Sequence, residues 1–154
     1  MNKVELQEIT LIGLPLKTKT TNANGQSAID CGNLWQEFEK GKYFEKIPGK
    51  LSNEILAVYN DYEGDHTKPY SYFIGCRVST DTEVPQGLGR LVIPPATYQK
   101  IIARGKMPDC VADAWREIWA SDIARAYQAD FELYDERIKD WNDAEVEIYL
   151  SVEE

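Results

Sequence analysis

Residues 130–152 constrain the fold more than any other stretch of the sequence. They read DFELYDERIKDWNDAEVEIYLSV, two segments of alternating apolar and polar residues on either side of a polar turn. Because successive side chains of a strand point to opposite faces, this pattern predicts an antiparallel hairpin. In the second segment, Val146, Ile148, Leu150 and Val152 share one face, and Glu145, Glu147 and Tyr149 share the other.

Two glutamates of this hairpin are candidates for a functional site. In the first segment Glu132 and Tyr134 share a face, and a symmetric turn is expected to bring Glu132 close to Glu147. Opposed like charges destabilise a sheet, so such a pair requires a cation, a shared proton or open solvent. The pattern therefore leaves two interpretations open: the charged floor of a pocket, or a solvated hairpin face. Glu145, nearer the turn, is expected in solvent.

The distribution of charge excludes some classes of partner. The chain has 154 residues, the length of one ordinary domain, and a formal net charge of −9. Residues 130–154 hold ten of its 26 acidic residues and two of its 17 basic ones. Such a surface repels phosphate backbones, so direct binding of nucleic acid is not expected. A cationic or neutral partner fits better, and the acidic C-terminal region is a candidate contact surface for a protein partner.

Other motifs set the expected compartment and argue against cofactors. Cys31, Cys76 and Cys110 are widely spaced without a CxxC pair, as expected in a reducing cytoplasm. His66 is the only histidine, and no phosphate-binding glycine motif is present, so neither a metal nor a cofactor is expected. The N-terminus is not a signal peptide, and no window reaches the roughly 18 apolar residues of a membrane span. We expect a cytoplasmic protein.

The first half of the chain predicts a strand, a helix and two strands. Residues 4–15 are apolar and β-branched up to a proline, which predicts the first strand. Ser27 is a candidate helix cap, and the helix is expected to end near Gly41. Its apolar face, at helical spacing, comprises Cys31, Leu34, Trp35 and Phe38. Residues 55–62 and 70–79 then predict two further strands.

The second half repeats this order. After a short strand at 90–93, residues 97–104 predict a strand, residues 108–124 a helix, and the hairpin completes the chain. The order predicts a single α+β domain, residues 1–154, built from two βαββ units at about 4–80 and 90–152. We expect two antiparallel sheets, two main helices and a central ligand cleft between the halves.

Aromatic residues suggest what such a cleft would bind. The chain has nine tyrosines and four tryptophans, and most of the tyrosines fall on predicted strands. Strands favour tyrosine in any case, and Trp35 lies on an apolar helix face where core packing is sufficient explanation. Aromatic faces also attract cations. Aromatic walls above a carboxylate would make a receptor for a flat cationic or amphipathic molecule.

Three segments carry a resemblance to a known family. YNDYEGDHTKPYSYFIGCRV, IPPATYQKIIARGKMPDCVADAWREIW and ADFELYDER followed by AEVEIYLSV resemble the GyrI-like small-molecule-binding domain. This domain is the effector-binding module of some AraC- and MerR-type transcription regulators, and it occurs in stand-alone and integron-cassette proteins. The resemblance implies the duplicated βαββ fold and an aromatic cleft whose acidic residue recognises cationic, lipophilic drugs. No helix-turn-helix accompanies the domain, so a DNA-binding regulator is not expected.

The resemblance also assigns candidate site residues. The closing-strand glutamate of the family corresponds to Glu147, and the glutamate of its FE-x-Y segment corresponds to Glu132. The aromatic positions of the cleft are assigned to Trp35, Tyr72, Tyr134 and Tyr149. A small-molecule-binding protein of the effector-binding type is the favoured function. The alternatives are a hydrolase of strained, cyclopropane-type natural products with Glu132 and Glu147 as catalytic residues, and a protein-interaction module.

Overall fold

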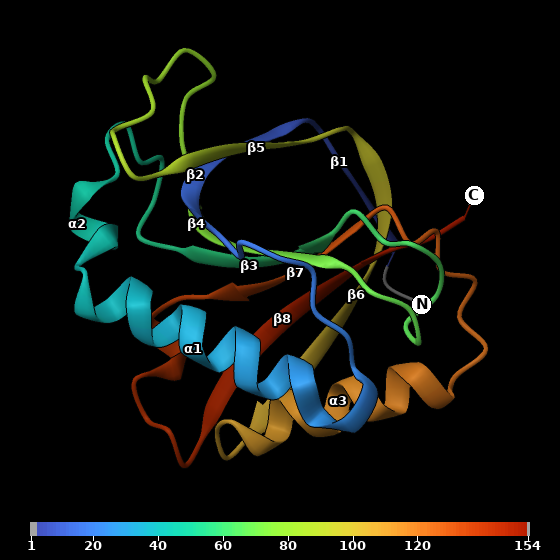
Figure 1. Ribbon diagram of the computed structural model, residues 1–154. Helices are drawn as coiled ribbons and strands as arrows, with labels where there is room; N and C mark the ends of the chain where they lie inside the picture. The colour runs from blue at the N-terminus through green and yellow to red at the C-terminus, as the bar shows by residue number, and fades with distance from the viewer. Residues whose placement is uncertain (1–2, 154) are drawn as a thin grey trace.

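The computed structural model describes residues 3–153, and the element order is the same in its two halves (Figure 1). The first half contains β1 (Lys3–Leu6), β2 (Ile9–Pro15), α1 (Gln26–Lys40), the short α2 (Tyr43–Lys46), β3 (Ile55–Asn60) and β4 (Ser71–Arg77). The second half contains β5 (Gly89–Ile93), β6 (Ala96–Gly105), α3 (Asp109–Ala120), β7 (Ala129–Tyr134) and β8 (Ala144–Ser151). The predicted α+β class, the repeated element order and the two main helices are confirmed.

The eight strands form one antiparallel sheet in the order β1-β6-β8-β7-β3-β4-β2-β5. The two sheets predicted from the sequence are joined because β3 of the first half pairs with β7 of the second, from Ile55↔Tyr134 to Asn60↔Ala129. Two separate sheets would leave the backbone groups of both strands unpaired at exposed edges. The expectation of two sheets was therefore wrong in this respect: pairing across the halves completes a single sheet.

The sheet curls because each of its edge strands, β1 and β5, continues along the chain into a strand near the opposite edge, β2 and β6 respectively (Figure 1). The chain runs from β1 into β2 and from β5 into β6, and these segments pair with each other along their length: Leu6 faces Ala96 and Ile9 faces Ile93. Between these pairs lie Pro94 and Pro95, which have no N–H to donate to a ladder. The single strand predicted for residues 4–15 is accordingly divided into β1 and β2.

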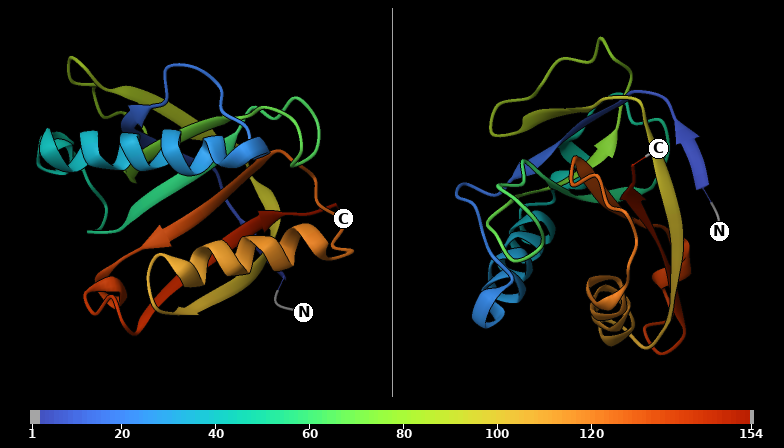
Figure 2. Two further views of the ribbon diagram at one scale, coloured as in Figure 1. Left: turned by 60° about the horizontal axis from the view of Figure 1, so that its bottom comes forward. Right: turned by 90° about the vertical axis from the view of Figure 1, so that its right-hand side faces the viewer.

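Helices α1 and α3 lie side by side on the same face of the sheet (Figure 2). Helix α1 begins after Gly25, whose φ of 71° is in the left-handed region that glycine adopts without strain. The predicted cap, Ser27, therefore lies within the first turn. Helix α3 buries Val111, Ala114, Trp115 and Ile118 against the sheet and ends at Ala120, four residues before the predicted end.

The curl divides the apolar residues into two clusters, one on each face of the sheet. The helix-covered face holds the larger cluster, which includes Phe38, Ile74, Ile148 and Leu150. The second cluster lies inside the curl and is supplied by strands, among them Leu11, Leu56, Val58, Phe73 and Phe131. Any strand between these clusters is buried on both faces, so each of its side chains is placed in one of two distinct environments.

Candidate functional site

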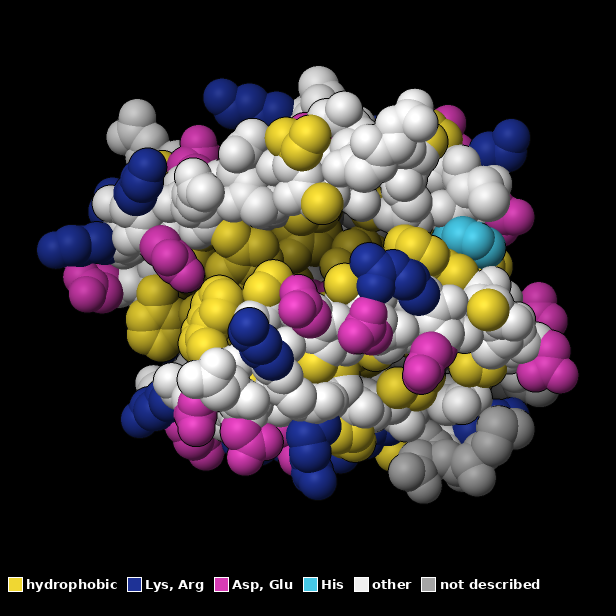
Figure 3. Space-filling view, turned by 90° about the horizontal axis from the view of Figure 1, so that it is seen from below, with side chains coloured by type: hydrophobic (Ala, Val, Ile, Leu, Met, Phe, Trp, Pro, Cys, Tyr) yellow, Lys and Arg dark blue, Asp and Glu magenta, His cyan; other side chains and the backbone are white. Residues whose placement is uncertain are grey.

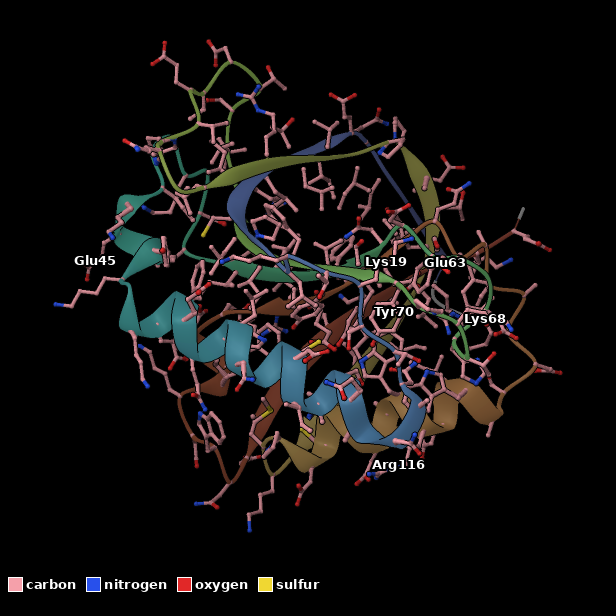
Figure 4. All side chains as sticks on the ribbon, in the orientation of Figure 1. Lys19, Glu45, Glu63, Lys68, Tyr70 and Arg116 are labelled. Carbon is pink, nitrogen blue, oxygen red and sulfur yellow. The ribbon has the colours of Figure 1, made fainter. Side chains whose placement is uncertain are left out.

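A cavity of about 660 Å³ lies between α1, α3 and the sheet, and we refer to it as the helix-side cavity. In the space-filling view of this face, apolar side chains line a hollow between two ridges of the surface (Figure 3). Tyr70, immediately before β4, and Arg116, on α3, both line it (Figure 4). Its aromatic walls comprise Trp35, Tyr59, Tyr62, Tyr70, Tyr72, Trp115, Trp119 and Tyr134.

Glu132, in the middle of β7, lies at the inner end of this cavity and is only 2% exposed. Its Oε2 accepts hydrogen bonds from Tyr59 Oη at 2.7 Å and Trp115 Nε1 at 2.6 Å, and its Oε1 accepts one from Tyr134 Oη at 2.5 Å. Among residues 3–153, no lysine, arginine or histidine forms an ion pair with it. Glu132 is thus a buried carboxyl group with neutral partners.

Burial raises the pKa of Glu132, because transfer of a carboxylate out of water disfavours the charged form. The hydrogen bonds from Tyr134, Tyr59 and Trp115 favour the carboxylate but offset only part of this effect. A positive charge entering the cavity would favour the ionised form.

The aromatic side chains around Glu132 are fixed by contacts with one another. Trp35 Nε1 donates to Tyr72 Oη at 2.9 Å, and the Trp35 ring meets Tyr134 edge-on with centroids 5.1 Å apart. The Tyr59 ring lies 5.0 Å from both Tyr72 and Trp115. Edge-to-face and tilted pairs at these separations are favourable, so the walls keep their geometry without a ligand.

Four of the six residues assigned from the sequence meet in this cavity: Trp35, Tyr72, Glu132 and Tyr134. Two equally close neighbours of Glu132, Tyr59 and Trp115, were not assigned. Tyr59 shares a face of β3 with Ala57, the residue that pairs with Glu132, but no pattern in the sequence predicts that pairing. Trp115 was placed on the apolar face of its helix, where nothing in the sequence distinguishes core packing from a cavity wall.

The predicted contact between Glu132 and Glu147 is wrong. In the β7–β8 ladder Glu132 pairs with Ile148, whereas Glu147 pairs with Leu133. The pairing expected from a symmetric turn, Glu132 opposite Glu147, is shifted by one residue from the observed pairing. A shift of one residue moves a side chain to the opposite face of the sheet. Glu147 and Tyr149 therefore lie on the face inside the curl, and the helix-side cavity receives Glu132 alone. A hydrolase that uses both glutamates in one cleft has no geometric basis here.

Glu147 lies at a second cavity of about 520 Å³, at one mouth of the curled sheet, which we call the mouth cavity. It accepts hydrogen bonds from Tyr149 Oη at 2.6 Å and Arg137 Nη1 at 3.0 Å, and Lys100 Nζ lies 3.2 Å away. Desolvation pushes the pKa of Glu147 upward, but these three donors outweigh it and hold the pKa below its ordinary value. The Tyr149 ring stacks on Phe131 with centroids 4.7 Å apart.

The described residues provide neither a cluster suited to a metal ion nor a helix suited to a membrane. Within residues 3–153, no cluster of three or more histidine, cysteine or acidic side chains is arranged to hold a metal ion. No helix in the described part of the chain has the length and apolar composition needed to cross a membrane.

Cys31 lines the helix-side cavity, and burial raises the pKa of its thiol to about 12, so the thiol stays protonated at neutral pH.

Several known proteins resemble this chain in sequence or in fold. The Vibrio cholerae integron cassette protein VCH_CASS2 is 27% identical, with a TM-score of 0.71 over 99% of this chain and 95% of that one. The Bacillus subtilis (strain 168) protein YobU, which bears the name of a transcriptional regulator, is 28% identical over 77% of each chain. SAV2435, whose structure is bound to tetraphenylphosphonium, is 18% identical with a TM-score of 0.79 over 99% and 93%.

The resemblance to effector-binding domains inferred from the sequence is confirmed by these matches. Residues 4–152, nearly the whole chain, match a single family, described as Cass2, integron-associated effector binding protein. This chain belongs to the Cass2 family of integron-associated effector-binding proteins.

Proposed function

We propose that the helix-side cavity binds hydrophobic, cationic or amphipathic small molecules, with Glu132 as the counter-charge. The observation that carries the proposal is a carboxyl group at the inner end of an aromatic cavity, hydrogen-bonded only to neutral donors. A buried carboxylate without a cation is unfavourable, and a cationic ligand supplies the missing charge. The ligand and Glu132 thereby stabilise each other.

The hydrogen bonds of Glu132 indicate how the cation is recognised. Three donors take three of the four acceptor positions of its oxygens, and its side chain is almost fully covered. A ligand positive charge therefore interacts with the ring faces of Tyr59, Tyr72 and Trp115 and, at longer range, with the carboxylate behind them. This mode requires no N–H on the ligand, so delocalised and quaternary cations are suitable.

The size of the cavity and a ligand bound by a protein of the same fold support the same class of ligand. Its volume of about 660 Å³ falls in the range of roughly 300–1,000 Å³ that small-molecule pockets occupy. SAV2435, a protein of the same fold, has a solved structure bound to tetraphenylphosphonium, a hydrophobic cation without N–H groups. Tetraphenylphosphonium is therefore a suitable first probe.

Isothermal titration calorimetry and tryptophan fluorescence test the proposal together. We expect one saturable site for tetraphenylphosphonium, with quenching of fluorescence because Trp35, Trp115 and Trp119 line the cavity. Trp141 is 57% exposed and does not line the cavity, so the Trp141→Phe variant should bind equally and retain the quenching. Absence of heat and of quenching across a panel of hydrophobic cations would overturn the proposed function.

A further inference from the structure

The helix-side cavity is elongated, and Glu132 lies near the middle of its length. The residues of α3 that line it recur along one face of the helix, from Val111 to Trp119. At about 1.5 Å per residue, this face is about 12 Å long. Trp115, which donates to Glu132, is its midpoint. A positive charge near Glu132 therefore leaves about 6 Å of lined cavity on either side for other parts of a ligand.

Strand β7 gives the same measure of length. Asp130, Glu132 and Tyr134 share its helix-covered face, and alternate residues of a strand are about 6.6 Å apart. At one end, Asp130 Oδ2 accepts a hydrogen bond from Tyr62 Oη at 2.6 Å. At the other end, Tyr134 meets Trp35 edge-on. The cavity thus has two ends, with Glu132 between them.

The two ends have different walls. Beside Trp35 and Tyr134, the start of α3 adds the aliphatic and thioether groups of Met107, Pro108 and Val111. The opposite end, which we call the Trp119 end, is lined by the rings of Tyr62, His66, Tyr70 and Trp119. A wall made of rings suits a flat aromatic group.

The charged residues that line the Trp119 end are paired within the protein. Arg125 Nη2 donates to Asp130 Oδ2 at 2.7 Å, and Asp130 is fully buried. Arg116 Nη1 lies 2.6 Å from Asp113 Oδ1. Because both guanidinium groups are balanced, this end suits an uncharged group better than a second ion.

His66 and Trp119 form a stacked pair at this end of the cavity. Their ring planes are parallel to within 5°, and their centroids lie 5.6 Å apart. His66 belongs to the loop between β3 and β4, in which its neighbours Asp65 and Thr67 are exposed and His66 itself is half-buried. The loop therefore directs this one side chain against the end of α3.

The position of His66 is fixed by hydrogen bonds on both sides of its peptide unit. Asn22 Nδ2 donates to the His66 carbonyl oxygen at 2.8 Å, and Asn22 Oδ1 accepts from Tyr70 Oη at 2.8 Å. Asp65 Oδ1 accepts from the backbone N of Thr67 at 2.9 Å. Because the loop is ordered in this way, a ligand ring that stacks on the pair need not order it first.

We propose that the ligands of this protein are cations with a flat aromatic arm, and that this arm stacks on the His66–Trp119 pair while the positive charge lies near Glu132. Trp119 lies four residues after Trp115, a rise of about 6 Å, which a chain of about three methylene groups spans. The inference deepens the proposed function and rests on it. It defines the ligand class as arylalkyl cations.

Two probes of matched length and charge test the inference in the wild-type chain. They are trimethyl(3-phenylpropyl)ammonium and (3-cyclohexylpropyl)trimethylammonium. Burial of apolar surface alone favours the cyclohexyl probe, whose ring is the more hydrophobic, whereas stacking on a ring pair favours the phenyl probe. We expect the phenyl probe to bind about three- to tenfold more tightly in calorimetry.

The outcomes separate this inference from the proposed function. Equal affinities, or tighter binding of the cyclohexyl probe, would overturn the inference and leave the proposed function intact. Absence of binding by both probes, when tetraphenylphosphonium binds, would do the same. Absence of binding by all three cations would overturn both.

Variants assign the preference to the stacked pair. His66→Leu combined with Trp119→Leu keeps an apolar surface but removes both rings, so the phenyl-to-cyclohexyl affinity ratio should fall to about one or below. Lys68→Leu is the control, because Lys68 is an exposed residue of the same loop that does not line the cavity (Figure 4). The control should keep the ratio. Both probes are measured on the same variant, so a general loss of stability does not change the ratio. A preference that survives in the double variant would place the arm elsewhere and overturn the inference.

Discussion

Glu132 and Glu147 belong to the same hairpin and have opposite characters. Glu132 is 2% exposed, is hydrogen-bonded to two tyrosines and a tryptophan, and has a raised pKa. Glu147 is in contact with Arg137, Lys100 and Tyr149, and has a lowered pKa. The strand register alone separates them, because it directs one to the helix-covered face and the other to the mouth of the curl.

The two faces differ in what they offer a carboxylate. Beneath the helices, Glu132 meets only neutral donors, so its charge is uncompensated until a cation enters. At the mouth, Lys100 from β6 and Arg137 from the β7–β8 turn compensate Glu147 within the protein. A glutamate without an internal cation is available for ligand recognition, whereas a paired one holds structural elements together.

The largest expected effect is on ligand affinity. Glu132→Gln removes the counter-charge and should weaken tetraphenylphosphonium binding by roughly 10- to 100-fold, or about 1.4–2.7 kcal/mol. Glu147→Gln, the same change on the other face, should alter affinity by less than about twofold, because its cavity is separate. Calorimetry measures both. Equal losses in the two variants, or a larger loss in Glu147→Gln, would place the ligand in the mouth cavity instead.

The pH dependence of binding should distinguish the two glutamates next. Tetraphenylphosphonium does not titrate, and it favours the ionised form of Glu132, whose pKa lies above its ordinary value of 4.5. Affinity should therefore rise with pH through this raised pKa, by at most about tenfold per pH unit for one proton. Calorimetry over about pH 5 to 8 should show this rise in wild type and Glu147→Gln. A rise of the same size in Glu132→Gln would assign the titration to another group.

The smallest expected effect is on stability. The lowered pKa of Glu147 means that its ion pairs stabilise the fold above its ordinary pKa and that this contribution is lost as pH falls through the lowered value. Glu147→Gln should lower the free energy of unfolding by roughly 0.5–1 kcal/mol at pH 7. The difference should vanish in strong acid, where Glu147 is as neutral as glutamine.

Urea denaturation at neutral pH and at about pH 3 checks this expectation. Glu153→Gln is the control, because Glu153 is an exposed glutamate beyond β8, and it should change stability at neither pH. A constant difference between wild type and Glu147→Gln at the two pH values would mean that packing, and not charge, explains the loss.

Local patterns in the sequence predicted most of the elements of the fold. The alternation in residues 144–151 identified the buried face of β8, on which Val146, Ile148 and Leu150 are fully covered. The spacing of Leu34 and Phe38 identified the buried face of α1. These predictions succeed because the period of a strand or helix is a property of neighbouring residues.

The offset between strands was beyond such patterns. Alternation assigns residues to the two faces of one strand, but the turn at residues 136–138 and the pairing of β3 with β7 set which faces coincide. For that reason the sequence placed Glu132 and Glu147 together, whereas the structure places them on opposite faces of the sheet. Tyr59 and Trp115 were missed because they reach Glu132 from β3 and α3, far along the chain.

The α+β class, the repeated order of elements, the aromatic content and the family could all be predicted from the residues alone. The tertiary structure decided that one sheet joins the halves, that Glu132 alone lies beneath the helices, and that Arg125 shares its cavity. The physical reason is that periodicity within a segment specifies faces, whereas the partner of a buried charge depends on register and packing between distant segments.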